Sequence, residues 1–130
     1  MNLSGLSLDQ APPLQALLNL FFIAPFFGIL FGVALLFFPQ ELLFDRYSYY
    51  CVAVIHLLSI GFMMPVMFGA LLQMLPVLAG VRFSKAYELS IFLSICIGFG
   101  VLFLSSGFIF YSTILLSLGG LFLGLSILFF

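Results

Sequence analysis

The sequence predicts an all-α polytopic membrane protein with four transmembrane helices, and both its composition and its hydropathy spacing support this fold class. Of the 130 residues, 65% are hydrophobic and only 5% are charged. A soluble domain carries about 25% charged residues, so a chain of this composition suits a lipid bilayer better than water. The length corresponds to one domain, and the net charge of -1 provides no basic face for nucleic acid.

Four apolar stretches are long enough to cross a bilayer, since a transmembrane helix needs about 20 apolar residues. The first two breaks between them contain charged residues. The third break, SSGFIFYST, contains none, and we expect a tight turn near the lipid headgroups whose hydroxyls satisfy backbone groups at the helix ends. The predicted spans are about 14–38, 50–79, 89–105 and 108–130.

The basic residues of the loops predict the orientation of these spans. Alternating spans place Arg82 and Lys85 on the side of both termini, whereas Arg46 stands alone on the other side. Cytoplasmic loops carry the excess of Lys and Arg. We therefore expect both termini in the cytoplasm and the protein in the inner (cytoplasmic) membrane.

Small residues predict close helix contacts in the first and the last span. Gly28 and Gly32 form a GxxxG pair, and Gly120 and Gly124 form another. Such pairs let two backbones approach without side chains between them. Glycine is also frequent in membrane helices without such a role, and the pattern leaves open whether the contacts lie within one chain or between chains.

The second span contains most of the residues that could bind a ligand. IHLLSIGFMMPVMFGALLQMLPVLAG, residues 55–80, includes the only histidine of the chain. A helix over 50–79 would be about 45 Å long, more than the bilayer core of about 30 Å, so it should tilt, kink or protrude. Pro65 and Pro76 each remove a backbone donor and favour kinks. Gly61 leaves room for a neighbouring helix or for a flat ligand.

At α-helical spacing, His56 lies on the same face as Met63, Met67, Ala70 and Met74. An ionisable residue within a span is a functional candidate, and neutral imidazole is the commonest metal ligand. There is a simpler alternative, in which the imidazole donates to a backbone carbonyl and the methionines are pliable packing residues.

His56, Gly61, Gly69, Pro76 and Gly80 form the pattern H-x4-G-x7-G-x6-P-x3-G. This pattern resembles the histidine-bearing helix of NnrS-type membrane proteins and of the wider heme-copper oxidase subunit I superfamily. The ending GALLQMLPVLAG is similar to that of NnrS-type sequences. The resemblance covers residues 55–80, while the other spans match only in hydropathy.

The resemblance implies a heme b protein of the membrane, with His56 as the axial ligand and Gly61, Met63, Met67 and Ala70 around the heme. Oxidase subunit I has twelve spans in three arcs of four helices, with several histidines for two hemes and copper. This chain has one histidine and four predicted spans, which is the number of helices in one arc. A homotrimer would rebuild the twelve-helix ring, and closed symmetry is usual in homo-oligomers. The implied roles are electron transfer or the binding of heme or a diatomic gas, and we do not expect an enzyme on its own.

Two other functions remain open. Soft thioethers select Cu(I), and the spacing of Met63 and Met67 is similar to the MxxxM of trimeric Ctr-type copper transporters. His56, Met63 and Met67 would then form a copper site. Alternatively, the chain is a structural or assembly subunit of a larger membrane complex, without a cofactor. No span contains a pair of carboxylates, which argues against a hydrolase, a kinase or a proton pump.

Overall fold

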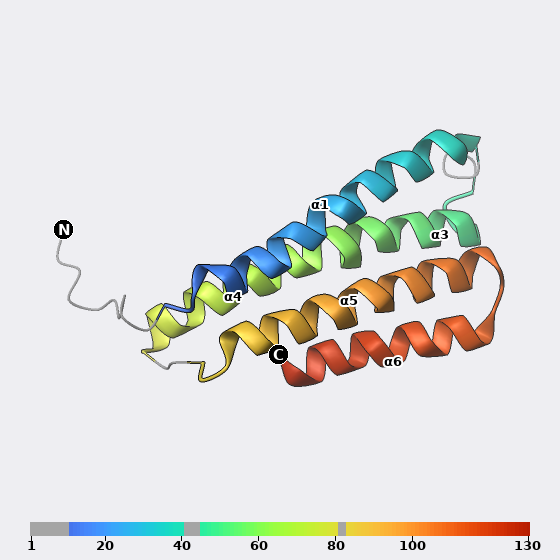
Figure 1. Ribbon diagram of the computed structural model, residues 1–130. Helices are drawn as coiled ribbons and strands as arrows, with labels where there is room; N and C mark the ends of the chain where they lie inside the picture. The colour runs from blue at the N-terminus through green and yellow to red at the C-terminus, as the bar shows by residue number, and fades with distance from the viewer. Residues whose placement is uncertain (1–10, 41–44, 81–82) are drawn as a thin grey trace.

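The computed structural model describes residues 11–40, 45–80 and 83–130, and every regular element in these ranges is a helix (Figure 1). The prediction of an all-α protein is therefore confirmed. The elements are α1 (Leu14–Phe37), α3 (Tyr49–His56), η2 (Leu57–Met63), α4 (Met64–Ala79), α5 (Ala86–Ile109) and α6 (Thr113–Phe129). Arg82, on which the predicted orientation partly rests, lies outside the described residues.

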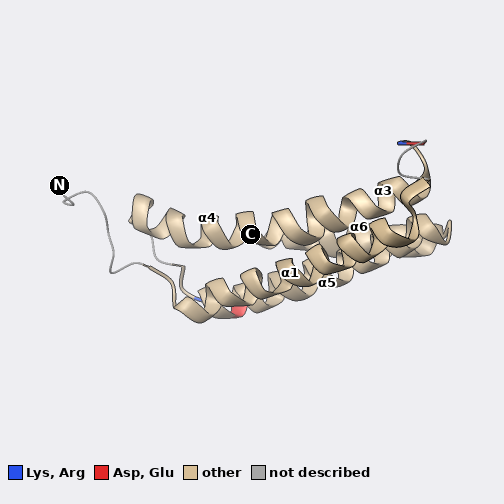
Figure 2. Ribbon diagram, turned by 90° about the horizontal axis from the view of Figure 1, so that it is seen from above, with Lys and Arg blue, Asp and Glu red and all other residues tan. Residues whose placement is uncertain are grey.

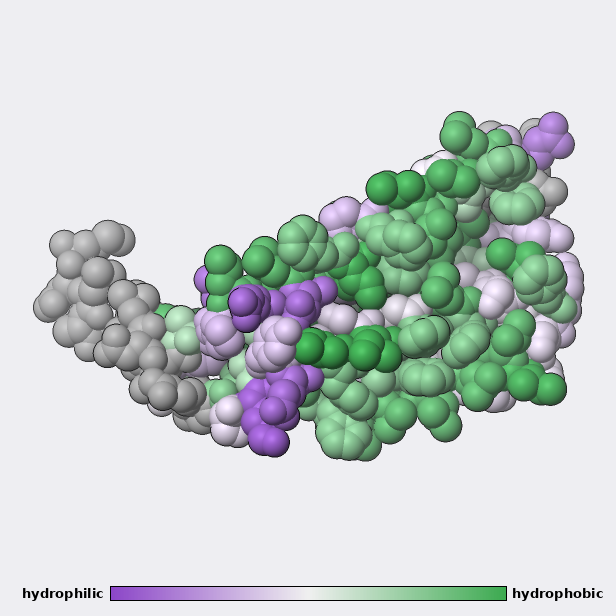
Figure 3. All heavy atoms as spheres, in the orientation of Figure 1, coloured by the Kyte–Doolittle hydropathy of each residue, from purple (hydrophilic) through white to green (hydrophobic). Residues whose placement is uncertain are grey.

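Three helices are long and apolar enough to cross a membrane. They are α1 with 24 residues, the continuous helix Tyr49–Ala79 with 31 residues, and α5 with 24 residues. The large hydrophobic side chains on their outer surface are exposed, and hydrophobic residues cover most of the face shown in Figure 3. This surface matches a bilayer, where apolar side chains meet lipid. The fourth helix, α6, is equally apolar but has only 17 residues, or about 26 Å.

The charged residues of the described ranges lie towards the two ends of the bundle, before α3 and at the start of α5 (Figure 2). Asp45 and Arg46 precede α3, and Lys85 and Glu88 flank the start of α5. Lys85 Nζ lies 3.2 Å from Glu88 Oε2, and both side chains are largely exposed. Each end of the bundle therefore has a polar edge, while the helices between them are apolar.

The third break of the chain is shorter than predicted and begins later. Because α5 continues to Ile109, Ser105 and Ser106 lie inside a helix rather than in a turn. The Ser106 hydroxyl donates to the Leu102 carbonyl one turn back, and the Ser105 hydroxyl donates to the Ala53 carbonyl of α3 at 3.1 Å. A hydroxyl that finds a carbonyl in this way needs no turn, which is why serine is a poor marker of a helix end in a membrane.

The helices pack as antiparallel neighbours, except that α1 and α5 run in the same direction (Figure 1). Within the described part of the chain, α1 contacts α3, η2, α4 and α5, whereas α6 lies along α5 alone. The core forms where α1, α4 and α5 meet. Its fully buried side chains include Leu20, Phe27, Leu72, Leu93 and Ile97.

Glycines on α5 and α6 let these two helices come into direct contact. A Cβ on Gly119 would lie 2.7 Å from the backbone nitrogen of Leu104, and one on Gly107 would lie 2.8 Å from the backbone nitrogen of Leu116. The predicted pair Gly120 and Gly124 has no atom within 4 Å of the Cβ positions. The pair therefore makes no close contact with the described residues, because the face of α6 that meets α5 passes through Gly119.

Of the other predicted pair, only Gly28 has a close neighbour in the part of the chain that the structure describes. Its Cβ position lies 3.3 Å from the ring of Phe62, whereas nothing lies within 4 Å of Gly32. Gly32 is therefore open to the surroundings of the chain, as are the two glycines on the outer face of α6.

Gly119→Ala should lower the free energy of unfolding by about 1–3 kcal/mol, because the new methyl group meets backbone atoms that cannot move aside. Gly120→Ala is the matched control and should not lower the free energy of unfolding of the single chain, since its Cβ would meet none of the described atoms and alanine is the better helix former. Unfolding in mild detergent, followed by circular dichroism, measures both. Equal effects of the two substitutions would contradict this packing of α6 on α5.

Candidate functional site

His56 is the last residue of α3, and its ring is held at one nitrogen. Nδ1 lies 2.6 Å from the carbonyl oxygen of Val52, one turn earlier in the same helix. A carbonyl can only accept, so Nδ1 carries the proton and Nε2 presents its lone pair. Histidines that bind metals are commonly fixed in this way by a backbone carbonyl. The ring is half-buried, with the Phe108 ring of α5 at a centroid distance of 5.3 Å.

The backbone directly after His56 is a π-helix, η2, which the sequence analysis missed. The Met64 N–H donates to the Ser59 carbonyl, five residues back. The Met64 N–H therefore does not donate to the Ile60 carbonyl, and Pro65 has no N–H that could donate to the Gly61 carbonyl. Two successive carbonyls lose their usual α-helical donors at this point. Single π-turns inside α-helices occur frequently at functional sites. The sequence signal for this π-helix is Pro65, from which the sequence analysis predicts only a kink.

The π-helix changes which residues share a face with the histidine. Across η2 the bonds span five residues instead of four, so α-helical spacing does not relate His56 to the methionines beyond it. Met63 and Met67 are 52% and 59% exposed, whereas His56 is half-buried against α5. Ala70 is also half-buried. The face predicted to carry both His56 and the methionines is therefore divided in two. The imidazole of His56 lies against α5, and the thioethers of Met63 and Met67 are exposed.

The two glycines of this helix are used for packing against α1. A Cβ on Gly61 would lie 2.6 Å from Cγ of Phe27, a ring that is only 1% exposed. A Cβ on Gly69 would lie 2.8 Å from the ring of Phe21. Of the two uses predicted for Gly61, the neighbouring helix therefore takes the space, and a flat ligand near His56 must lie on another side of the helix.

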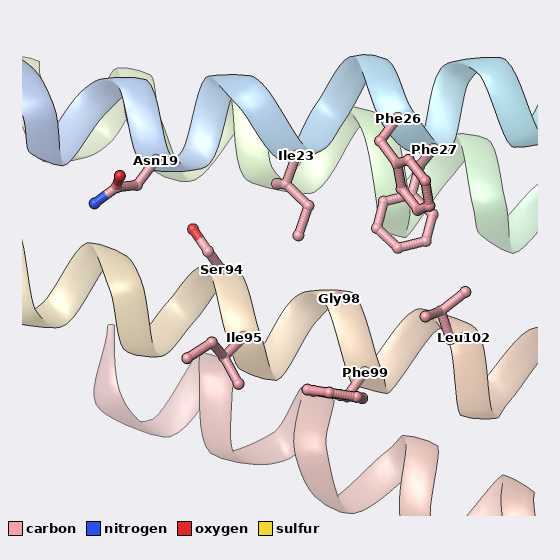
Figure 4. A pocket seen from close by; sticks show the side chains of 9 residues that line it. All are labelled: Asn19, Ile23, Phe26, Phe27, Ser94, Ile95, Gly98, Phe99 and Leu102. Carbon is pink, nitrogen blue, oxygen red and sulfur yellow. The ribbon is translucent and has the colours of Figure 1, made fainter.

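A second polar feature, absent from the sequence analysis, lies between α1 and α5. Asn19 Nδ2 donates to Ser90 Oγ at 3.0 Å, and Ser90 in turn donates to the Tyr87 carbonyl. One turn further along α5, the buried Oγ of Ser94 has no hydrogen-bond partner among the described residues. Figure 4 shows this hydroxyl pointing from α5 towards α1, into a cavity whose lining is otherwise apolar except for Asn19. Its signal was an asparagine in the first span and serines four residues apart in the third.

Neither of the features is a cluster of charged metal ligands. Among the described residues, no three His, Cys, Asp or Glu side chains come together.

Comparisons with known proteins give no relative for the chain. No family model, no curated protein and no solved structure matches it. The resemblance of residues 55–80 to NnrS-type proteins and to oxidase subunit I therefore stays a prediction, and the function is argued from the geometry of the site.

The tautomer of His56 can be tested directly, because the chain has no other histidine. In ¹⁵N NMR spectra of ligand-free protein in nanodiscs at pH 8, Nδ1 should be the protonated nitrogen and Nε2 the unprotonated one. The reason is the bond from Nδ1 to the Val52 carbonyl. Protonation at Nε2 instead would mean that this contact is not a hydrogen bond and that the ring is not oriented for ligation.

Proposed function

We propose that this chain is an integral membrane heme-binding protein in which Nε2 of His56 is an axial ligand of heme b. The observation that supports this most is the contact between His56 Nδ1 and the Val52 carbonyl at 2.6 Å, which leaves Nε2 available. Phe108 provides an aromatic wall beside the ring. Arg46 lies at the same end of the bundle, so a heme propionate that extended towards this edge would meet a basic residue there. When bound, a heme supplies redox-active iron, and its axial ligands and surroundings set its potential.

In this proposal the heme lies between copies of the chain. His56 retains partial exposure, and neither the cavity between α1 and α5 nor the one between α5 and α6 is lined by it. Gly32, Gly120 and Gly124 present open surfaces on which another copy can pack closely. A homotrimer would use these surfaces, form a ring of twelve helices and bring three copies of His56 into one assembly.

The proposed topology has α6 as the fourth span. Its 17 residues are the lower limit for crossing a bilayer, and a span of this length requires little tilt. An even number of spans places both termini on one side, together with Lys85, while Arg46 lies on the other. We assign the side of the termini to the cytoplasm of an inner-membrane protein, following the excess of basic residues there.

Copper binding is the second candidate, and the exposure of the two methionines favours it. Met63 and Met67 are four residues apart and are both more than half exposed. In a trimer, such pairs from three copies could form a ring of thioethers, which are ligands suited to Cu(I). This site would depend on the methionines, whereas heme binding depends on His56.

Heme and copper can be separated by one experiment on purified protein. After reconstitution with heme b, the reduced protein should show a Soret band with sharp α and β bands, and His56→Ala should lose it almost completely. Ser59→Ala is the control, because Ser59 is exposed and bonds only to the Ile55 carbonyl of its own helix. A full Soret band in His56→Ala would refute the heme proposal.

The same samples test copper. Retention of Cu(I) that is lost in Met63→Leu and Met67→Leu, without any heme spectrum, would favour the second candidate. Binding of neither group would leave a structural or assembly subunit, in which His56 serves only the hydrogen bond to Val52.

The oligomeric state is a separate prediction. Native mass spectrometry from mild detergent should show three copies of the chain. Gly124→Leu should shift the distribution towards monomer without loss of helix content, because the leucine projects from a face that is open within the chain. A spectrum that contains only monomer under the mildest conditions would count against the ring.

A further inference from the structure

We propose that the cavity between α1 and α5 binds a neutral, flat, lipid-soluble molecule with ring carbonyls, a compound of the quinone class. The cavity has a volume of about 410 Å³, which is in the range of small-molecule sites. Its walls include three phenyl rings, from Phe26, Phe27 and Phe99, and its polar groups are the side chains of Asn19 and Ser94 (Figure 4). The site is distinct from His56 and does not depend on heme or copper binding.

Ser94 provides the observation that points to a ligand. The other buried or half-buried serines of these helices donate to carbonyls, as Ser90 does to Tyr87, Ser105 to Ala53 and Ser126 to Leu123. Ser94 Oγ is buried, and residues 11–40, 45–80 and 83–130 offer it no hydrogen-bond partner. In a bilayer no water is at hand to satisfy such a hydroxyl. A ligand in the cavity with a hydrogen-bond acceptor at the position to which the hydroxyl points would accept the missing hydrogen bond.

The depth of Ser94 selects the kind of acceptor. Glu88 marks the polar edge of the bundle at the start of α5, and Ser94 lies about 9 Å further along this helix. A phospholipid whose headgroup is at that edge would present only methylene groups at this depth. A ring carbonyl on a lipid-soluble molecule places an acceptor within the hydrocarbon region itself.

The remaining walls select a neutral and planar ligand. No charged side chain of the described ranges lines the cavity, so these walls offer no compensation for the charge of a carboxylate or a phosphate. Phenyl rings stack against a flat conjugated ring. Asn19 is already held by Ser90 and adds a fixed amide at the same end of the cavity.

Access is from the bilayer. The rim residues Phe26, Ile95, Phe99 and Leu102 are between 42% and 52% exposed, whereas Phe27 at the base is 1% exposed. A hydrophobic ligand with an isoprenoid or alkyl tail could therefore enter sideways and leave its tail among the lipids.

Photolabelling with an azidobenzoquinone in nanodiscs tests this site, with peptide mapping by mass spectrometry. Labels should fall on α1 and α5 around the cavity, and decylubiquinone should displace them. Ser94→Ala should need about five- to tenfold more decylubiquinone for the same displacement, because one buried hydrogen bond is lost. Ser94→Thr keeps the hydroxyl and should stay close to the unmodified chain. Ser117→Ala, an exposed serine on α6, is the matched control.

Three results would overturn the proposal. The first is labelling spread evenly over all lipid-facing helices. The second is equal competition by decylbenzene, which has the tail and a ring but no carbonyl; the cavity would then be a lipid-filled groove. The third is an unchanged concentration dependence in Ser94→Ala when its thermal stability matches that of the unmodified chain.

Discussion

A bilayer offers the chain no hydrogen-bonding solvent, and this constraint explains the placement of most polar side chains between the two edges, with Ser94 as the exception. In an apolar medium an unpaired polar group is expensive, so serine, asparagine and histidine side chains turn to carbonyls or to each other. The bonds from His56 to Val52, from Ser105 to Ala53 and from Asn19 to Ser90 follow from it. Two of these bonds link separate helices, so they also help to fix how α1, α3 and α5 pack against one another.

The same constraint makes close packing of small residues the main source of helix association. Lipid tails are as apolar as leucine, so burying leucine between two helices gains little over leaving it in lipid. Close contact forms instead where a glycine, which has no side chain, leaves room for a large side chain or for the backbone of a neighbouring helix. Gly61 receives the ring of Phe27, Gly69 receives that of Phe21, and Gly119 admits the backbone of Leu104. The glycines that meet no other described atom lie on exposed faces, which is why we propose them for contacts between chains.

The sequence predicted the helices and the apolar surface well, because both follow from composition averaged over about 20 residues. The sequence-based prediction failed where a single backbone hydrogen bond determines which side chains share a helix face. The spacing of His56 and Met63 assumed a regular α-helix, and the five-residue bond between Met64 and Ser59 removed that regularity. The pairing of glycines likewise depends on which face of α6 meets α5, and Gly119 and Gly120 are adjacent in the sequence. Ser94 gave no signal of its own, since its lack of a partner is a property of the packed structure.

The unusual polar features lie towards opposite ends of the bundle. The His56 ring contacts Phe108 near the end of α5, whereas Ser94 lies in the first half of that helix. Ser94 and Phe108 are about 21 Å apart along the helix axis, so a ligand at one cannot touch the other in a single chain. Each feature lies inside the bundle near a different charged edge: His56 follows Arg46 along the chain, and Ser94 follows Glu88 along α5. A group bound at His56 and a molecule bound at Ser94 would therefore occupy different leaflets, and each must be recognised by the helices around it alone.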